Sequence, residues 1–319
     1  MPIKKNLSVL IKGIMMGSAD VVPGVSGGTI AFITGIYEEL IKTIDGLDFG
    51  LLTGIFKDGI QTTFKKYNLG FLGSLALGIA ISILSLSKAI TYLLENHPVL
   101  LWAFFFGLVV ASVLYIGKQI SKWNVGVIIA IVIGTIISYY ITIAEPLGSP
   151  DSWWYIIFSG FIAIIAMILP GVSGAFLLLL LGSYKTILGS ISGLVEALGS
   201  GDWSLVGKYL SNLALFAVGC IAGLKVFSRV LTWLFDNYKN LTLALLTGFM
   251  IGSLNKLWPW KRVLEYRTNS HDVEVPFLEE SVMPGSYDGD PQLIWVILLA
   301  ILGFILILGL EKWAQSKTS

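Results

Sequence analysis

One short motif occurs twice in this chain and breaks an otherwise apolar sequence each time. Residues 23–37 read PGVSGGTIAFITGIY, and residues 170–184 read PGVSGAFLLLLLGSY. Both fit P-G-V-S-G, seven variable residues and then G-x-Y, with Pro23 and Pro170, like Tyr37 and Tyr184, 147 residues apart. In a membrane protein, breaks at corresponding positions of two halves are the best sequence pointer to a transport site.

Composition places the chain in a lipid bilayer. Hydrophobic residues make up 55% and charged residues 13% of the sequence, and mean hydropathy is +0.82, whereas soluble domains carry about 25% charged residues. The basic residues are scattered, so nothing indicates nucleic-acid binding. A single cysteine, Cys220, and two histidines, His97 and His271, predict no disulfide, no metal site and no Cys/His catalysis.

Lys4 and Lys5 before Leu7–Met16 resemble a signal peptide, but the motif follows at once, so we expect this segment to belong to the mature fold.

A second block of similarity supports duplication. Residues 78–96 and 219–237 match at a constant separation of 141 residues, and Gly107 and Ser112 continue the match with Gly248 and Ser253. Fixed internal similarity over such a span indicates two repeats. The shorter separation predicts a shorter connection in the second half.

Segment lengths predict an all-α integral membrane protein with two inverted-topology repeats, each a re-entrant helical hairpin followed by three transmembrane helices. A full crossing needs about 20 apolar residues. We assign residues 1–145 to the first repeat, with its hairpin at 7–44, an interfacial helix within 45–67, and crossings at 69–94, 99–117 and 124–144. Residues 146–319 form the second repeat, with its hairpin at 153–194 and crossings at 205–235, 241–258 and 293–311.

The distribution of charge predicts the orientation. With both termini in the cytoplasm, most lysines fall inside, whereas the acidic loop 259–291 falls outside, as the positive-inside rule requires. An odd number of crossings per repeat then makes the second repeat inverted. The loop is either an extracytoplasmic cap or a flexible insertion.

The motif has the composition of an anion site. Pro23 and Pro170 would end one half-helix of each hairpin, and Ser26 and Ser173 would cap the next. A helix N-terminus carries partial positive charge and binds anions, phosphate especially. The alternative is that the glycines only allow close helix packing. The predicted phosphate-binding residues are the motif positions and one matched basic pair: Gly24, Val25, Ser26, Gly27, Gly28, Thr29, Gly171, Val172, Ser173, Gly174, Lys88 and Arg229.

Charged and aromatic residues near the breaks are candidates for coupling or gating, because charges are costly in the membrane. They are Asp20, Tyr37, Glu38, Glu39, Tyr184 and Lys185. Asp20 would carry a proton or a cation, or merely brace the loop; its counterpart is Met167. A Glu38–Lys185 contact is conceivable, and the charged side chains could equally snorkel to the interface. The two tyrosines are compatible with packing as well as with ligand binding. The matched basic pair, Lys88 and Arg229, is compatible with snorkelling to the interface as well as with binding phosphate.

Two stretches resemble a known family. ADVVPGVSGGTIAFITGIYEEL at 19–40 and LPGVSGAFLLLLLGSY at 169–184 are similar to the signature blocks of the bacterial polyprenyl-phosphate transporter family (PopT), formerly a membrane family of unknown function. The resemblance covers nearly the whole chain. It implies transport of undecaprenyl phosphate from the outer to the inner leaflet of the cytoplasmic membrane, which recycles the lipid carrier of cell-wall synthesis.

The resemblance fits the anion-site interpretation, since the substrate head is one phosphate and its prenyl tail can stay among membrane lipids. We expect no cofactor, with sodium or protons as candidate coupling ions, and the sequence does not indicate an oligomeric state. Two other functions remain open: a membrane phosphatase acting on undecaprenyl pyrophosphate, and a carrier of a small soluble anion. No His or Arg lies in the signature blocks, which disfavours the phosphatase.

Overall fold

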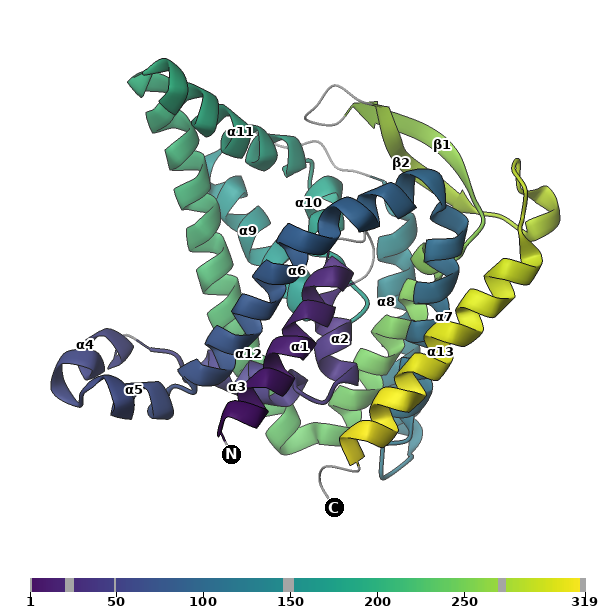
Figure 1. Cartoon of the computed structure of the whole chain (residues 1–319), viewed down its shortest axis with the longest axis horizontal. Helices are drawn as coiled ribbons and strands as arrows, with labels where there is room; N and C mark the ends of the chain where they lie inside the picture. Colours follow the sequence, from purple (N-terminus) through teal and green to yellow (C-terminus); the bar gives the residue numbers. More distant parts are fainter. Residues whose placement is uncertain (1, 21–25, 49, 146–151, 269–273, 316–319) are drawn as a thin grey trace.

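The structure is a computed structural model that describes residues 2–20, 26–48, 50–145, 152–268 and 274–315. The described residues form helices and one two-stranded sheet (Figure 1). In chain order the elements are α1 (Pro2–Asp20), α2 (Gly27–Ile33), α3 (Tyr37–Gly46), α4 (Gly50–Lys57), α5 (Ile60–Lys66), α6 (Leu69–Asn96), α7 (Pro98–Gly117), α8 (Val125–Ile143), α9 (Trp153–Ile168), α10 (Gly174–Leu180), α11 (Tyr184–Ser200), α12 (Trp203–Leu257), β1 (Lys261–Thr268), β2 (Glu274–Ser281), the 3₁₀ turn η1 (Pro284–Ser286) and α13 (Leu293–Gln315).

Several helices have the length and composition of membrane spans. They are α6, α7, α8 and α12, and the bent pair of α10 and α11 passes the same test when taken together. Helices α9 and α13 are shorter but also apolar. Large apolar side chains such as Ile136 of α8 and Ile294 of α13 lie exposed, which suits contact with lipid and not with water. The chain is therefore a multi-pass, helical membrane protein.

The long helices break at matched positions. Tyr238 interrupts α12 with φ −136° and ψ 45°, and His97, between α6 and α7, has φ −137° and ψ 46°. These two residues are 141 residues apart, the separation that relates the second block of similarity. Residues 203–257 thus contain two helical segments, in keeping with separate crossings at 205–235 and 241–258.

Each predicted hairpin contains one more break than the sequence suggested. We expected a single helix over 29–44 and another over 175–194, but the structure divides them into α2 and α3 and into α10 and α11. The cause is the glycine of G-x-Y: Gly35 has φ +72° and Gly182 has φ +69°, a left-handed conformation that ends a helix and favours glycine.

Close helix contacts also recur in matched form. Helix α1 packs on α6, and α9 packs on the first part of α12. A Cβ on Gly78 would overlap the carbonyl oxygen of Leu10, and one on Gly219 would overlap that of Ile157. Glycine is needed at both crossings because the backbones themselves are in contact.

The remaining long helices pair between the two halves of the chain. Helix α7 packs on α13, and α8 packs on the second part of α12. The matched glycines again lie at the crossings, since a Cβ on Gly107 would overlap the backbone of Ala300 and one on Gly248 that of Ile131. The third crossing helix of each half thus lies against the second crossing helix of the other.

The loop over 259–291 contains regular structure. Strands β1 and β2 pair antiparallel, so the described part of this loop is a β hairpin. Its base is fixed by Trp258, whose Nε1 donates to the Val282 carbonyl, and by Trp260, whose Nε1 donates to that of Pro291. Figure 1 shows the hairpin at the opposite end of the molecule from both termini. The segment over 45–67, expected to hold one interfacial helix, holds two short ones, α4 and α5, which protrude from the body.

The glycine crossings make a direct prediction about stability. Gly78→Ala should lower the melting temperature in detergent, because overpacking a close contact costs about 1–3 kcal/mol. Gly73→Ala, on the same helix but with nothing within 4 Å of an added Cβ, should leave it unchanged or raise it slightly. Equal melting temperatures for the two variants, by static light scattering or tryptophan fluorescence, would contradict the packing described.

Candidate functional site

The first motif forms a capped helix start. Ser26 is the N-cap of α2, and its Oγ accepts a hydrogen bond from the Gly28 N–H at 3.1 Å. A Cβ on Gly28 would overlap the Ile168 carbonyl oxygen, so only glycine permits the close approach of the second motif here. The predicted site residues Gly24 and Val25 lie outside the described residues.

The second motif repeats this arrangement. Ser173 is the N-cap of α10, with its Oγ accepting from the Phe176 N–H at 3.4 Å. Gly171 has φ +83°, a conformation that glycine adopts without strain. Val172 is buried and Gly174 is half-buried. The N-cap roles predicted for both serines are thus present.

The two motifs contact each other. The Ser26 hydroxyl faces the carbonyl oxygens of Met167 and Leu169, at 3.1 and 3.3 Å. The Gly171 N–H donates to Thr29 Oγ1 at 2.9 Å. Ser26 and Thr29 are 2% and 1% exposed, so these polar groups are satisfied inside the protein and not by water. The structure brings predicted residues that lie more than 140 positions apart into one site.

Asp20 occupies the start of α2. Its Oδ1 accepts a hydrogen bond from the Gly27 N–H at 2.6 Å, and a Cβ on Gly27 would collide with this carboxylate. The next two N–H groups are bonded as well, Gly28 to Ser26 Oγ and Thr29 to the Ser26 carbonyl. The bracing role considered for Asp20 is therefore its role in this conformation.

The second motif lacks such a carboxylate. Met167 stands at the position that corresponds to Asp20, and no hydrogen bond joins the N–H groups of Gly174 or Ala175 to any residue in the described part of the chain. An anion at this helix start would meet less competition than at α2. The two motifs are alike in backbone but different in charge.

A cluster of ion pairs joins α3 to α12. Glu38 lies 3.1 Å from both Lys42 and Lys239, and Lys42 lies 2.8 Å from Asp236. The hypothesis of a Glu38–Lys185 contact is therefore wrong for this conformation, because Glu38 has other partners and Lys185 is exposed on α11.

Of the matched basic pair, the structure describes only the side chain of Arg229, and its ion pair lies at the end of α3. Arg229, whose side chain is 75% exposed, lies 3.7 Å from Asp45 at the end of α3, and Lys88 lies within α6, where its side chain is not among those described. Lys225, which sequence reasoning did not single out, donates to the carbonyl oxygens of Asp45 and Leu47. It lies one helical turn before Arg229, which is the signal that could have identified it.

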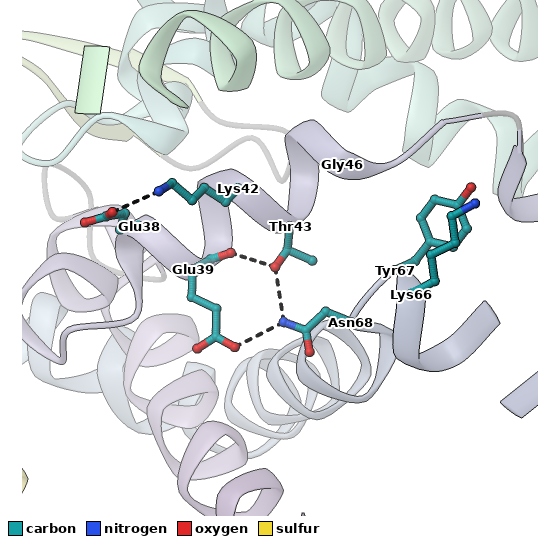
Figure 2. A pocket seen from close by; sticks show the side chains of 8 residues that line it. All are labelled: Glu38, Glu39, Lys42, Thr43, Gly46, Lys66, Tyr67 and Asn68. Carbon is teal, nitrogen blue, oxygen red and sulfur yellow. Dashed lines mark hydrogen bonds and ion pairs between the residues drawn. The ribbon is translucent and has the colours of Figure 1, made fainter. Parts of the chain in front are cut away.

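A polar cavity of about 480 Å³ opens between α3 and the start of α6 (Figure 2). Asn68 bridges its two walls, donating to Glu39 Oε1 at 3.1 Å and Thr43 Oγ1 at 3.3 Å. The other lining residues are Glu38, Lys42, Gly46, Lys66 and Tyr67. Two carboxylates and two ammonium groups balance in charge, so the cavity has no net preference for an anion.

The two motif tyrosines are placed differently. Tyr37 is 2% exposed and packs edge-on against Phe32 and Phe235, which is a core role. Tyr184 begins α11 and is half-buried.

Sequence reasoning also missed how the carbonyl groups at the G-x-Y break are satisfied. Lys12 Nζ of α1 donates to the Thr34 carbonyl at 2.7 Å, and Tyr155 OH of α9 donates to the Leu181 carbonyl at 2.9 Å. Thr34 and Leu181 are 147 residues apart. A lysine in the middle of an apolar helix was the available signal for Lys12.

The site has no metal-binding constellation within the described residues, where no group of three His, Cys, Asp or Glu side chains could hold an ion. What the arrangement offers chemically is backbone N–H groups, serine and threonine hydroxyls and one carboxylate in a buried position. Such groups bind an anion or exchange a proton.

Comparisons with known proteins agree with this chemistry. The profile of the VCA0040-like family, described as undecaprenyl phosphate translocase-like, matches residues 16–275. A protein of Vibrio cholerae serotype O1 named polyprenyl-phosphate transporter is 41% identical over 313 residues, covering 97% of each chain. A Staphylococcus aureus protein of the same name is 33% identical over 263 residues, covering 78% of this chain and 85% of its own length. No solved structure matches.

The contact between the motifs predicts the effect of one substitution. Thr29→Val should lower the melting temperature, because it leaves the Gly171 N–H without its acceptor and an unpaired buried donor costs about 1–3 kcal/mol. Thr34→Val is the matched control. The Thr34 hydroxyl donates to the Ile30 carbonyl, and the Thr34 N–H donates to the same carbonyl, so this substitution leaves no group without a partner there. If the two variants have the same melting temperature, the hydrogen bond between the motifs does not contribute to stability.

Proposed function

The chain belongs to the VCA0040-like family, and we propose that it is a transporter, not an enzyme, that carries polyprenyl phosphate across the membrane. The observation that carries the proposal is the direct contact of the two motif regions inside a helical membrane protein. Ser26 donates to carbonyl groups just before the second motif, and the Gly171 N–H donates to Thr29. The names of its relatives supply the substrate class.

The fold is proposed to be two inverted-topology repeats, residues 1–145 and 146–319. Three observations support this: the equal torsions at His97 and Tyr238, the matched positive φ at Gly35 and Gly182, and the placement of both termini at one end. The re-entrant hairpins would then enter from opposite faces and meet at the motifs.

Transport is proposed to run from the outer to the inner leaflet of the bacterial cytoplasmic membrane. The lysine-rich end with both termini would face the cytoplasm, as the positive-inside rule predicts. Undecaprenyl phosphate delivered in this direction would return to cell-wall synthesis. Its prenyl tail would remain among lipids, because only the charged head is costly to move through hydrocarbon.

Of the two motifs, the phosphate is proposed to bind the second before the first, because the N–H groups of Gly174 and Ala175 and the hydroxyl of Ser173 lie together there. Binding at α2 requires Asp20 to release the Gly27 N–H, since two anions cannot share one donor. Protonation of Asp20, or its capture by a sodium ion, would free that donor. In this way Asp20 would couple transport to an ion gradient.

Alternating access is supported by a difference between the two halves. Helix α3 packs on α12 of the other half, whereas α11, which follows the second motif, packs on α12 of its own half. Equivalent helices with different partners are expected if the structure is one of two exchangeable states. The ion pairs of Glu38 with Lys239 and of Lys42 with Asp236 would close the cytoplasmic side in this state.

Serine substitutions test the binding site. Ser173→Ala and Ser26→Ala should each reduce transport of polyprenyl phosphate in proteoliposomes at least tenfold, because loss of one charge-assisted hydrogen bond costs about 1.5–3 kcal/mol. Ser183→Ala is the control, since Ser183 lies in the same half as Ser173 and is as buried as Ser26, but it bonds Ser159. Full transport by both motif variants, at wild-type melting temperature, would refute the site; release of inorganic phosphate would indicate a phosphatase.

Cross-linking tests the alternation between states. In a Cys220→Ala background, cysteines at Glu38 and Lys239 joined by a short reducible bifunctional reagent should stop transport, because they lock α3 to α12. Cysteines at Ser18 and Ser82, whose hydroxyl oxygens lie 2.8 Å apart within one half, should leave transport intact when joined. Transport that continues through the Glu38–Lys239 cross-link would exclude this contact as a gate.

A further inference from the structure

A second charged cluster lies beneath the β hairpin, at the end of the molecule opposite the termini. Lys256 of α12 and Lys261 of β1 approach the same oxygen of Glu279 on β2, at 2.9 and 3.6 Å. Their side chains are 15%, 7% and 19% exposed. We call Lys256, Lys261 and Glu279 the hairpin cluster.

The hairpin cluster carries an uncompensated positive charge. Two ammonium groups share one carboxylate, and Lys261 Nζ, which lies 3.8 Å from the centre of the Trp102 ring, makes no hydrogen bond to a described residue. Burial lowers the pKa of Lys261 to about 7, although the nearby Glu279 acts in the opposite direction. Burying a charge without full pairing is costly, so an anion of higher charge than one carboxylate, such as a phosphate monoester, would balance the two ammonium groups better.

The hairpin cluster is next to the second motif. Lys256 Nζ lies 5.1 Å from the centre of the Phe176 ring, and the Phe176 N–H is the one that Ser173 caps. Between β2, α8 and α10 there is a crevice of about 10 Å³ lined by Thr142, Phe176, Leu179, Leu180, Lys256 and Glu279 among others. This space holds about one water molecule, so an incoming anion has to take the place of the Glu279 carboxylate.

We propose that the hairpin cluster receives the phosphate monoester head of the lipid before it reaches the PGVSG loops, with Glu279 as an internal carboxylate that the phosphate displaces. This inference rests on the proposed function and adds a site to it. Lys256 and Lys261 would pair with the phosphate oxygens once Glu279 is released. The head group would then lie near Phe176, the residue whose N–H Ser173 caps.

The proposal predicts opposite effects for charges of opposite sign. Lys256→Gln and Lys261→Met should each raise the KM for polyprenyl phosphate supplied in the hairpin-side leaflet by about tenfold, since each loses a charge-assisted contact to phosphate. Glu279→Gln should lower this KM, because it removes the competing anion. It should also lower kcat where release of the phosphate from the hairpin cluster limits the rate. Arg262→Gln is the matched control, as Arg262 on the same hairpin forms an exposed pair with Asp288.

A pH series adds a second test. Lys261 is faced by Glu279 of β2, Lys256 of α12 and the ring of Trp102 of α7. Its ammonium form binds the phosphate, so the wild-type KM should rise as the pH on the hairpin side increases through about 7. This rise should be absent in Lys261→Met.

A purely structural role gives a different pattern. If the hairpin cluster only fastens the hairpin, all three variants should lower the melting temperature and transport together, with no KM effect of opposite sign. That result would overturn the proposal while wild-type transport, and hence the proposed function, stands. Inorganic phosphate, added at millimolar concentration as a competitor, should inhibit weakly if the site takes a lipid head group; inhibition as strong as that by a short prenyl phosphate would overturn the lipid assignment.

Discussion

The contact between the two motif regions is the interaction on which the rest of the structure depends. The hydroxyls of Ser26 and Thr29 are buried and have their partners in the second motif or just before it. In a membrane, backbone groups that leave a helix must be satisfied inside the protein, because lipid offers no hydrogen bonds. Each broken helix is therefore stable only against the other, and the site exists only when both halves are assembled.

The same constraint explains why the motif combines proline, glycine and serine. Serine caps the half-helix that the break exposes, and Gly28 allows the Ile168 carbonyl to approach. Both motifs begin a serine-capped half-helix, but Asp20 precedes only the first, and Met167 stands at the corresponding sequence position before the second. Under the proposed function, a duplicated backbone with a single carboxylate would supply both the symmetry for two states and the asymmetry for coupling to an ion.

Much of the fold could be predicted from the sequence, because membrane helices are encoded locally by apolar length and interrupted by Pro and Gly. The family, the membrane class, the N-cap roles of Ser26 and Ser173 and the meeting of the motifs all follow from the duplicated motif. The break at Gly35 was not predicted, since a glycine in an apolar run is compatible with a continuous helix until its φ is known. The two strands of the β hairpin were not predicted either, because their polar sequences show no clear alternation of apolar and polar residues.

Pairings between distant side chains were the least predictable part of the candidate site. Glu38 was matched to Lys185 by position in the repeat, yet it pairs with Lys42 and Lys239, because α3 packs on α12 of the other half. The partner of Asp20 is the Gly27 N–H of α2, and this contact depends on the packing of α2 against α1. In the proposed alternating-access cycle such contacts would differ between the two states, and one sequence encodes both.

The measurement that tests this account most directly is leaflet exchange of radiolabelled undecaprenyl phosphate in proteoliposomes. An impermeant phosphatase added outside hydrolyses only lipid in the outer leaflet. With the protein present, we predict that the whole lipid pool is consumed and that no phosphate is released before the phosphatase is added. A protected inner-leaflet fraction equal to that of protein-free vesicles, under sodium and proton gradients of either direction, would contradict the account.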